Sequence, residues 1–240
     1  MTRLLYQTNS YLKQFSANVE RVMADTHAIL LDQTAFYPGG GGQVYDKGII
    51  EFNGVKAILK RGKYSPDGIL HIFEEGEPIP EVGCEVTGTL DWDRRYQVMR
   101  THTAMHILCG TIFRDYRALV TGGDMEPLKG RMDFEFENLT KDLVAVIENA
   151  VNKEVAAARD VRVAIHSREE AFKIPDLIRT KINLLPPHIQ EVRTVEIVGL
   201  DLQADGGTHV NNTSEVGKIY ITDYKSKGRI NKRLYIELES

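Results

Sequence analysis

Apolar residues in about the first 90 positions come in short runs, separated by glycine, asparagine, aspartate or proline. Such runs predict β-strands, and an Asn-Gly pair at 53–54 predicts a tight hairpin between two of them. The clearest runs are 28–32, 48–52, 55–60, 69–73 and 86–92. Five or six short strands at this spacing predict a small β-barrel, interrupted by a longer insertion at 33–48.

The pattern changes near Asp93, where apolar positions begin to recur at every third or fourth residue. From Arg94 to about Tyr116 the chain has no proline and a single glycine, so this segment predicts an α-helix. One face of the helix carries Met99, His102, His106, Cys109 and Phe113. A neighbouring apolar stripe is formed by Val98, Met105, Leu108 and Ile112.

The rest of the chain predicts a mixture of helices and strands. A second helix is expected over about 141–159 with Thr140 as its N-cap. Ser167 and Glu170 have the spacing of a capping box that opens a short helix before Pro175. Strands are expected at 161–167, 190–200, 218–224 and 233–239.

The predicted fold class is therefore α+β. A small N-terminal β-barrel with a glycine-rich loop is expected over residues 1–92. A mixed domain of helices and antiparallel sheet is expected over residues 93–240.

Composition narrows the class of protein. The 240 residues are 42% hydrophobic and 27% charged, which is typical of a soluble globular protein long enough to bury a core. The two cysteines, Cys84 and Cys109, do not make a disulfide framework and indicate a reducing, cytoplasmic location. No apolar run is long enough for a signal peptide or a membrane span, so neither is expected.

A basic segment lies near the C-terminus although the formal net charge is -4. It contains Lys218, Lys225, Lys227, Arg229, Lys232 and Arg233 against one acidic residue, Asp223. The overall charge argues against a protein that coats nucleic acid along its whole surface. The segment itself fits either a solvated face or an edge that contacts phosphates.

Two histidines on the first predicted helix are candidate metal ligands. His102 and His106 are four residues apart, so their imidazoles share one face and can reach one ion. Neutral imidazole nitrogens suit zinc. The alternative is a histidine pair on the surface or half-buried, without a metal. No glutamate follows His102, which excludes the helix of the HExxH metalloproteases.

A second candidate is the segment 205–209, Asp-Gly-Gly-Thr-His. Gly206 and Gly207 permit positive φ angles, which would let Asp205 and His209 both turn towards one ligand. A carboxylate and an imidazole would then complete a set of four ligands with the histidine pair. The alternative is a turn with an exposed histidine.

The insertion in the predicted barrel contains four consecutive glycines, Gly39, Gly40, Gly41 and Gly42, followed by Gln43. The backbone N–H groups of such a run could surround an anion or a nucleotide, and Gln43 adds an amide that both donates and accepts. The run is not a Walker loop, because no Lys-Ser or Lys-Thr pair follows it. A flexible hairpin tip is the alternative.

The order of these motifs closely resembles the editing domain of alanyl-tRNA synthetase. The matching segments are 32–48, 91–108, 205–217 and 227–233. With no aminoacylation domain attached, the chain is similar to the free-standing alanyl-tRNA editing proteins of the AlaX family, in particular the medium-sized members with an N-terminal barrel. The resemblance runs from about Leu30 to Arg233, and the stretch 118–195 carries little of it.

The resemblance implies a function and its residues. Members of this family hydrolyse the ester that joins a wrong amino acid, chiefly serine, to tRNA(Ala), and glycine is a second candidate. The implied Zn²⁺ ligands are His102, His106 and His209. The implied substrate-binding residues are Gly39, Gly40, Gly41, Gly42 and Gln43, together with Thr103, which would tune acceptance of the serine hydroxyl. Lys225, Arg229 and Arg233 would contact tRNA phosphates.

One position departs from the family pattern. The family loop reads Cys-Gly-Gly-Thr-His with the cysteine as fourth ligand, and here that position is Asp205. A carboxylate oxygen is a competent zinc ligand, harder than a thiolate, and would leave the metal a stronger Lewis acid but more weakly bound. Alternatively, Asp205 orients His209 from outside the ligand set and leaves a position for water.

We therefore expect a zinc-dependent hydrolase of Ser-tRNA(Ala), with Thr103, Gln43 and Asp205 as catalytic residues. Zinc would either activate water and polarise the carbonyl, or bind the amino group of the ester. An apolar pocket cannot strongly reject an added hydroxyl, so discrimination should rest on hydrogen bonds to the serine hydroxyl from Thr103 and Gln43. The alternatives are a non-catalytic tRNA-binding module, an editor of a different tRNA or ester, and a structural zinc protein.

Overall fold

The computed structural model describes residues 2–175, 177 and 190–240. The chain divides into two compact units, residues 1–97 and 98–240, and each is described by itself. Helix α1 (Trp92–Tyr116) begins in the first unit and continues through the second. The domain boundary expected after residue 92 stays a prediction. None of the described helices is long and apolar enough to cross a membrane.

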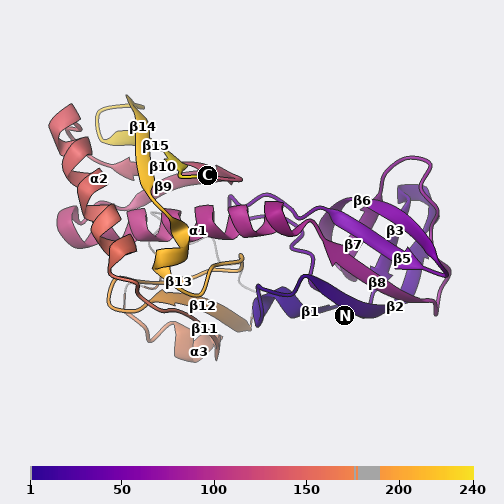
Figure 1. The fold of residues 1–240 in the computed structure, drawn as a ribbon. Helices are drawn as coiled ribbons and strands as arrows, with labels where there is room; N and C mark the ends of the chain where they lie inside the picture. The colour runs from indigo at the N-terminus through magenta and orange to yellow at the C-terminus, as the bar shows by residue number, and fades with distance from the viewer. Residues whose placement is uncertain (1, 176, 178–189) are drawn as a thin grey trace. The chain divides into compact units, whose positions relative to one another are not determined.

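The first unit is built around a closed barrel of six strands in the order β2-β3-β7-β6-β5-β8, all paired antiparallel (Figure 1). The strands are β2 (Gln14–Met23), β3 (Ala28–Leu31), β5 (Gly48–Phe52), β6 (Val55–Ser65), β7 (Gly68–Phe73) and β8 (Glu85–Leu90). A short parallel pair, β1 (Arg3–Leu4) and β4 (Gln33–Thr34), belongs to the same unit. The predicted barrel is confirmed, and Asn53 and Gly54 form its tight β5–β6 turn with φ angles of 48° and 75°.

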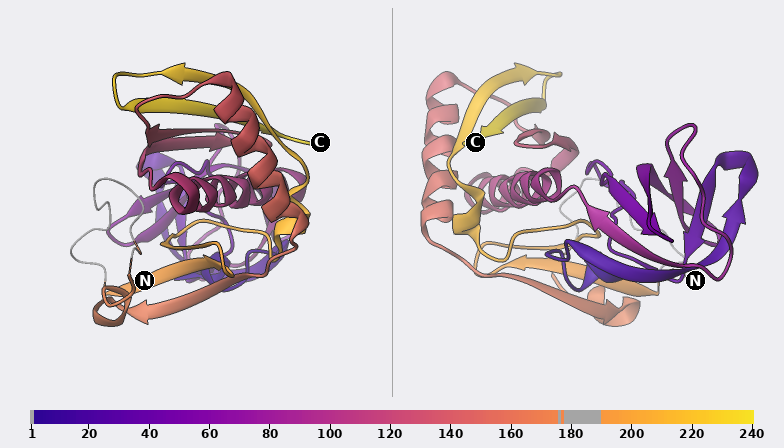
Figure 2. Two further views of the ribbon diagram at one scale, coloured as in Figure 1. Left: turned by 90° about the vertical axis from the view of Figure 1, so that its left-hand side faces the viewer. Right: turned by 45° about the vertical axis from the view of Figure 1, so that its right-hand side comes forward.

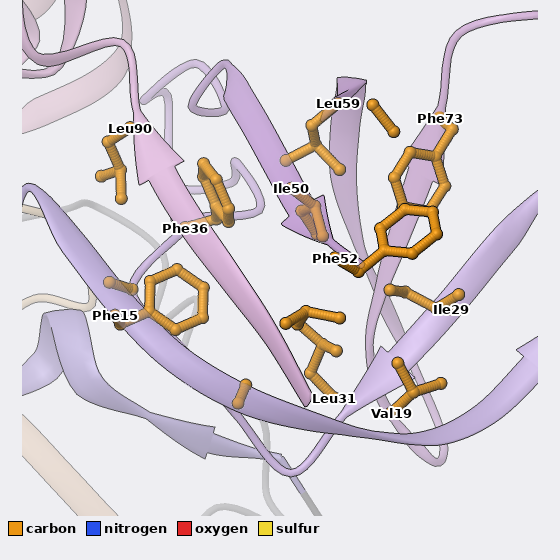
Figure 3. Packing of buried hydrophobic residues seen from close by; sticks show 14 residues of the cluster. Phe15, Val19, Ile29, Leu31, Phe36, Ile50, Phe52, Leu59, Phe73 and Leu90 are labelled. Atoms are coloured by element: carbon orange, nitrogen blue, oxygen red, sulfur yellow. The ribbon is translucent and has the colours of Figure 1, made fainter. Parts of the chain in front are cut away.

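The barrel interior is filled by aromatic and aliphatic side chains (Figure 3). Along β2 the buried residues alternate with exposed ones, whereas all four residues of β3 are buried. Phe15 and Phe36 meet edge to face, with ring centroids 5.5 Å apart. A Cβ on Gly88 would lie 2.4 Å from Cε1 of Phe15, so only glycine lets this ring lie against β8. The barrel is therefore a packed core rather than an open channel.

In the second unit, α1 lies between two antiparallel sheets (Figure 1 and Figure 2). The four-stranded sheet has the order β14-β15-β10-β9 and the three-stranded sheet the order β11-β12-β13. The elements are β9 (Val120–Glu126), β10 (Lys129–Glu135), α2 (Lys141–Ala156), β11 (Val161–Ser167), α3 (Arg168–Ala171), β12 (Glu191–Ile197), β13 (Asp201–Ala204), β14 (Ile219–Ser226) and β15 (Asn231–Leu238). Helix α2 packs against β14. The α+β class expected from the sequence is confirmed.

Local signals in the sequence set several element ends correctly. The Thr140 hydroxyl accepts a hydrogen bond from the Leu143 N–H at 3.2 Å and caps α2. The side chains of Ser167 and Glu170 form the expected reciprocal capping box at α3. Strand β2, the hairpin β9–β10 and strand β13 lie in segments where the sequence pattern predicted no strand.

Helix α1 is buried almost all round from Val98 to Ile112, with Arg100 as the partly exposed exception. Glycines in the β9–β10 hairpin give it room: a Cβ on Gly130 would lie 2.7 Å from Sδ of Met105. A helix covered on both sides has no broad polar face, which is why histidines and threonines on α1 are buried.

Acid should weaken the barrel through His71, which lies on β7 and is fully buried. Its Nε2 lies 2.8 Å from the Thr34 hydroxyl, and burial lowers its pKa to about 4. Between pH 6.5 and pH 4 the unfolded chain binds a proton that the folded barrel does not, so stability falls as the pH falls. Going from pH 7 to pH 5 should reduce the free energy of unfolding by about 2 kcal/mol, at about 1.4 kcal/mol per pKa unit.

Urea unfolding followed by fluorescence measures this effect, because the single tryptophan, Trp92, lies in the barrel unit. His71→Gln removes the titrating group while keeping a polar side chain, and should flatten the pH dependence. Equal losses between pH 7 and pH 5 in the wild type and His71→Gln would mean that another group causes them.

Candidate metal centre

Four side chains from α1 and from the loop after β13 converge in the second unit. His102 and His106 lie one turn apart on α1, Asp205 follows β13 directly, and His209 lies four residues further on. One ligand atom from each lies within 4.8 Å of all the others. The three histidines are 2–6% exposed, so the cluster is nearly closed to solvent.

The separations of Asp205 from the three histidines are close to those between the ligands of a four-coordinate zinc ion. Oδ2 of Asp205 lies 3.3 Å from Nε2 of His102 and 3.8 Å from Nε2 of His106, and its Oδ1 lies 3.1 Å from Nε2 of His209. Ligands about 2.0–2.1 Å from a tetrahedral zinc ion are about 3.3 Å from one another. The donor set, three imidazoles and one carboxylate, is also one that zinc accepts.

Contacts from a neighbouring strand and from its own loop hold Asp205 in place. The backbone N–H of Asp205 donates to the Arg193 carbonyl at 3.1 Å, and Nη1 of Arg193 donates to the Asp205 carbonyl at 2.9 Å. The Gly207 N–H donates to Oδ1 of Asp205 at 2.7 Å. Asp205 is thus tied to β12 by its backbone and to the loop by its side chain.

The expected role of the two glycines in this loop was wrong in one respect. Neither Gly206 nor Gly207 is among the residues with a positive φ angle in the described chain. The side chain of Asp205 instead accepts the Gly207 N–H within the loop. Among the described residues, no atom would lie within 4 Å of a Cβ on Gly206.

Thr103 lies inside the cluster and has no exposed surface. Its hydroxyl lies 3.2 Å from Nδ1 of His209 and accepts a hydrogen bond from the Val210 N–H at 3.3 Å. A histidine that donates from Nδ1 presents the lone pair of Nε2, and in His209 that atom faces Asp205. Thr103 therefore supports the orientation of His209.

The protonation states of the cluster follow from burial and from Asp205. Burial lowers the pKa of His102, and lowers that of His209 well below its ordinary value, with Asp205 opposing both shifts. Burial also acts on His106, but hydrogen bonds to Asp201 and Asp205 outweigh it and raise its pKa to about 9. Burial alone would raise the pKa of Asp205, yet the charge and hydrogen bond of His102 hold it well below the ordinary range. A metal ion binding here would therefore find the Asp205 carboxylate already ionised, and it would have to displace a proton from His106.

Two residues beside the cluster were missed by the sequence analysis. Oδ2 of Asp201 lies 3.0 Å from Nδ1 of His106, and Nε2 of Gln203 donates to the same Oδ2 at 2.6 Å. Both lie on β13, and their alternation in the run Asp-Leu-Gln-Ala-Asp is the only signal that could have found them.

The glycine run lies in the barrel unit and forms a tight turn. All four of its glycines have positive φ angles, from 58° to 129°. The N–H of Gly40 donates to the Gln43 carbonyl and the N–H of Gln43 to the Gly40 carbonyl, so these two amides are used within the turn. The Tyr37 hydroxyl donates to the Gly40 carbonyl at 2.9 Å, and Gln43 is buried.

The basic segment forms the β14–β15 hairpin, and its cations are not equivalent. Arg233 donates from Nε and Nη2 to the two carboxylate oxygens of Asp133, at 2.6 and 2.8 Å, and its side chain is 17% exposed. Lys225 is exposed and lies 3.2 Å from Asp223. Arg229 is exposed in the turn between the strands. The charge of Arg233 is thus neutralised within the protein, whereas Arg229 projects from the hairpin.

Two family models match separate parts of the chain. Residues 5–94 match the model of class II (A) tRNA synthetases. Residues 192–235 match the second additional domain of threonyl and alanyl tRNA synthetases, a range that contains Asp205 and His209. The first match covers the barrel, and the second covers the loop of Asp205 and His209 and the β14–β15 hairpin as far as Tyr235.

Curated relatives match the chain over its whole length. The alanyl-tRNA editing protein AlaX-M of Saccharolobus solfataricus is 39% identical over 98% of both chains. The protein of the same name from Methanosarcina mazei is 38% identical over 99% of this chain and 97% of its own. The alanine–tRNA ligase of Pyrobaculum neutrophilum is 37% identical over 92% of this chain, which corresponds to 25% of the ligase. The resemblance found in the motifs is confirmed, and the chain belongs to the family of the alanyl-tRNA editing proteins AlaX-M.

Proposed function

We propose that this protein hydrolyses the ester of mischarged tRNA(Ala), removing serine and, as a second substrate, glycine, in a zinc-dependent reaction. The observation that carries the proposal is the convergence of His102, His106, Asp205 and His209 in a chain of the alanyl-tRNA editing family. Charged tRNA is used in the cytoplasm, and the two cysteines are compatible with that location.

The four clustered side chains would hold Zn²⁺, with Asp205 as the fourth ligand. Zinc supplies ester hydrolysis with a water of lowered pKa and a polarised carbonyl. The protein itself would keep these ligands in fixed positions and shielded from solvent. Arg193 and the Gly207 N–H hold Asp205, and Thr103 supports His209. A site held this firmly loses little free energy to reorganisation during the reaction.

Discrimination between serine and alanine would depend on the serine hydroxyl. Thr103 is proposed to contribute through His209, because its hydroxyl already accepts the Val210 N–H and lies against Nδ1 of His209. Gln43 and the turn of Gly39, Gly40, Gly41 and Gly42 are proposed, from the family resemblance, as the barrel unit's contribution to binding the charged tRNA. A site that hydrogen-bonds the serine hydroxyl rejects alanine and glycine, which both lack it, more strongly than an apolar pocket could, so we expect glycine to be released more slowly than serine.

The β14–β15 hairpin is proposed to contact the tRNA backbone. Arg229 is exposed, and Lys225 is exposed but lies 3.2 Å from Asp223, so Lys225 and Arg233 would exchange their contacts with Asp223 and Asp133 for phosphates. Each phosphate contact releases condensed counterions, so binding should weaken as the salt concentration rises.

The direct test is the rate of amino-acid release from Ser-tRNA(Ala), Gly-tRNA(Ala) and correctly charged Ala-tRNA(Ala), with and without a chelator. We expect fast release of serine, little release of alanine, and loss of activity on chelation that added Zn²⁺ restores. A folded, zinc-loaded protein that binds tRNA(Ala) but releases no amino acid would instead be a binding module. Equal release of serine and alanine would remove the editing role.

The chemistry of the fourth ligand can be tested at Asp205. Asp205→Cys should bind Zn²⁺ at least as tightly as the wild type, because a thiolate is a stronger zinc donor than a carboxylate. Asp205→Ala should bind it more weakly. Zinc affinity measured by competition with a chromogenic chelator checks both variants. Unchanged affinity in both would place Asp205 outside the ligand set.

A further inference from the structure

Helix α1 contains one glycine, Gly110, one turn after His106. Glycine in a helix interior is less favourable than alanine. A Cβ at Gly110 would lie 2.8 Å from Cβ of Asp201 and 3.1 Å from both Cγ and the carbonyl oxygen of Leu200. The missing side chain therefore lets the start of β13 touch the helix at this turn.

Close contact at Gly110 brings the carboxylate of Asp201 to His106. Asp201 is 4% exposed, and its Oδ2 lies 3.0 Å from Nδ1 of His106. Gln203, two residues further along β13 and so on the same side of the strand, donates to that Oδ2 at 2.6 Å. The amide of Gln203 keeps the Asp201 carboxylate oriented, and Asp201 in turn contacts the imidazole.

The contact determines which nitrogen of His106 faces the cluster. A neutral imidazole that donates its Nδ1–H to a carboxylate carries its lone pair on Nε2. In this structure Nε2 of His106 points to the cluster side, 3.8 Å from Oδ2 of Asp205. Carboxylates that hold a metal-binding histidine in this way fix its tautomer and increase its basicity.

We propose that Asp201 is a positioning residue that holds His106 for the metal ion, and that Gly110 is glycine so that Asp201 can reach it. The inference rests on the metal site of the proposed function. It adds to that site two residues, one on β13 and one on α1, that would not touch the metal ion themselves.

Zinc affinity, measured by chelator competition on the full chain, tests the proposal. Asp201→Ala should weaken zinc binding by about 10–100-fold, the usual effect of removing such a partner. Asp201→Asn should lie between Asp201→Ala and the wild type, because its amide oxygen is a weaker acceptor for the imidazole N–H. Circular dichroism of the metal-free proteins separates loss of zinc binding from loss of the fold.

Gly110→Ala tests the proposal independently of the Asp201 variants. Alanine favours a helix, so on propensity alone this change would stabilise α1. We expect it to weaken zinc binding as Asp201→Ala does, and the double variant should be little weaker than either single variant, because both changes remove the same contact. Gly122→Ala on β9 is the matched control. Among the described residues, its added Cβ would have only Oδ2 of Asp133 within 4 Å, at 3.9 Å. Zinc binding should therefore be unchanged in this variant.

The outcomes separate this inference from the proposed function. A wild-type protein that binds no Zn²⁺ would remove the proposed metal site itself. Tight zinc binding by the wild type with equal affinity in Asp201→Ala and Asp201→Asn would overturn the role of Asp201 alone. Should Gly110→Ala fail to fold, the two Asp201 variants still decide the matter.

Discussion

His209→Ala should remove zinc binding and the release of serine from Ser-tRNA(Ala) together. His209 is 2% exposed and lies against both His102 and His106, with ring centroids 4.1 and 4.7 Å away. Without its Nε2 the proposed metal ion would lose one of its four protein ligands. Because a catalytic metal supplies several kcal/mol of transition-state stabilisation, we expect deacylation to fall by about 10³-fold or more.

The control is a histidine of the same unit outside the cluster. His166 lies on β11, with Nε2 3.2 Å from the Thr194 hydroxyl. His166→Ala should leave zinc content and deacylation near the wild-type values, measured by elemental analysis and by release of labelled serine. Full activity in His209→Ala would end the zinc hypothesis, and loss of activity with retained zinc would give His209 a role other than ligand.

Asp46→Ala should destabilise the barrel unit by about 3–5 kcal/mol, the usual result of leaving a buried charge without its partner. Arg95 has no exposed surface, and its Nε donates to both carboxylate oxygens of Asp46, at 2.9 and 3.0 Å. The same guanidinium donates to the carbonyls of Ser10 and Ala35. Asp46 also accepts the Tyr37 N–H at 2.6 Å, so its loss would loosen the base of the glycine turn as well.

A second Arg–Asp pair in the same unit provides the comparison. Arg21 and Asp67 are 2.8 Å apart, and both side chains are 54% exposed. Asp67→Ala should therefore cost less than about 1 kcal/mol. Urea unfolding followed by Trp92 fluorescence compares the two variants, and similar costs would show that burial of the Asp46 pair has no special effect. Asp46→Leu combined with Arg95→Met should be milder than Asp46→Ala, because no charge is then stranded.

Much of the fold could be predicted where local patterns and burial agree. The run at 48–52, the Asn-Gly turn and the run at 55–60 predicted the β5–β6 hairpin, because apolar residues alternate and the turn residues accept positive φ angles. Thr140 predicted the start of α2 for the same local reason, since a side-chain cap needs only residues of its own turn.

The missed strands have weak local signals and depend on their neighbours. Strand β2 carries small and polar residues beside its buried Phe15, Ala17 and Val19, and it pairs with the next strand, β3, and with β8 from a distant part of the chain. The β9–β10 hairpin is rich in glycine and charge, which disfavours strands in isolation. Two of its glycines, Gly123 and Gly130, lie against Met105 of α1, a contact that the sequence pattern does not reveal.

The candidate metal ligands, too, were predicted partly from local patterns and decided partly by contacts between distant positions. The sequence by itself determined that His102 and His106 share a helix face, because that relation follows from the helical period alone. It also marked Asp205 and His209 as candidates through the segment Asp-Gly-Gly-Thr-His. Only the tertiary structure decided that these residues converge within 4.8 Å, that Thr103 and Asp201 lie behind two of the imidazoles, and that Arg233 is already paired with Asp133. Such contacts join positions about 95 to 107 residues apart, and local patterns along the chain carry no information about which distant side chains meet.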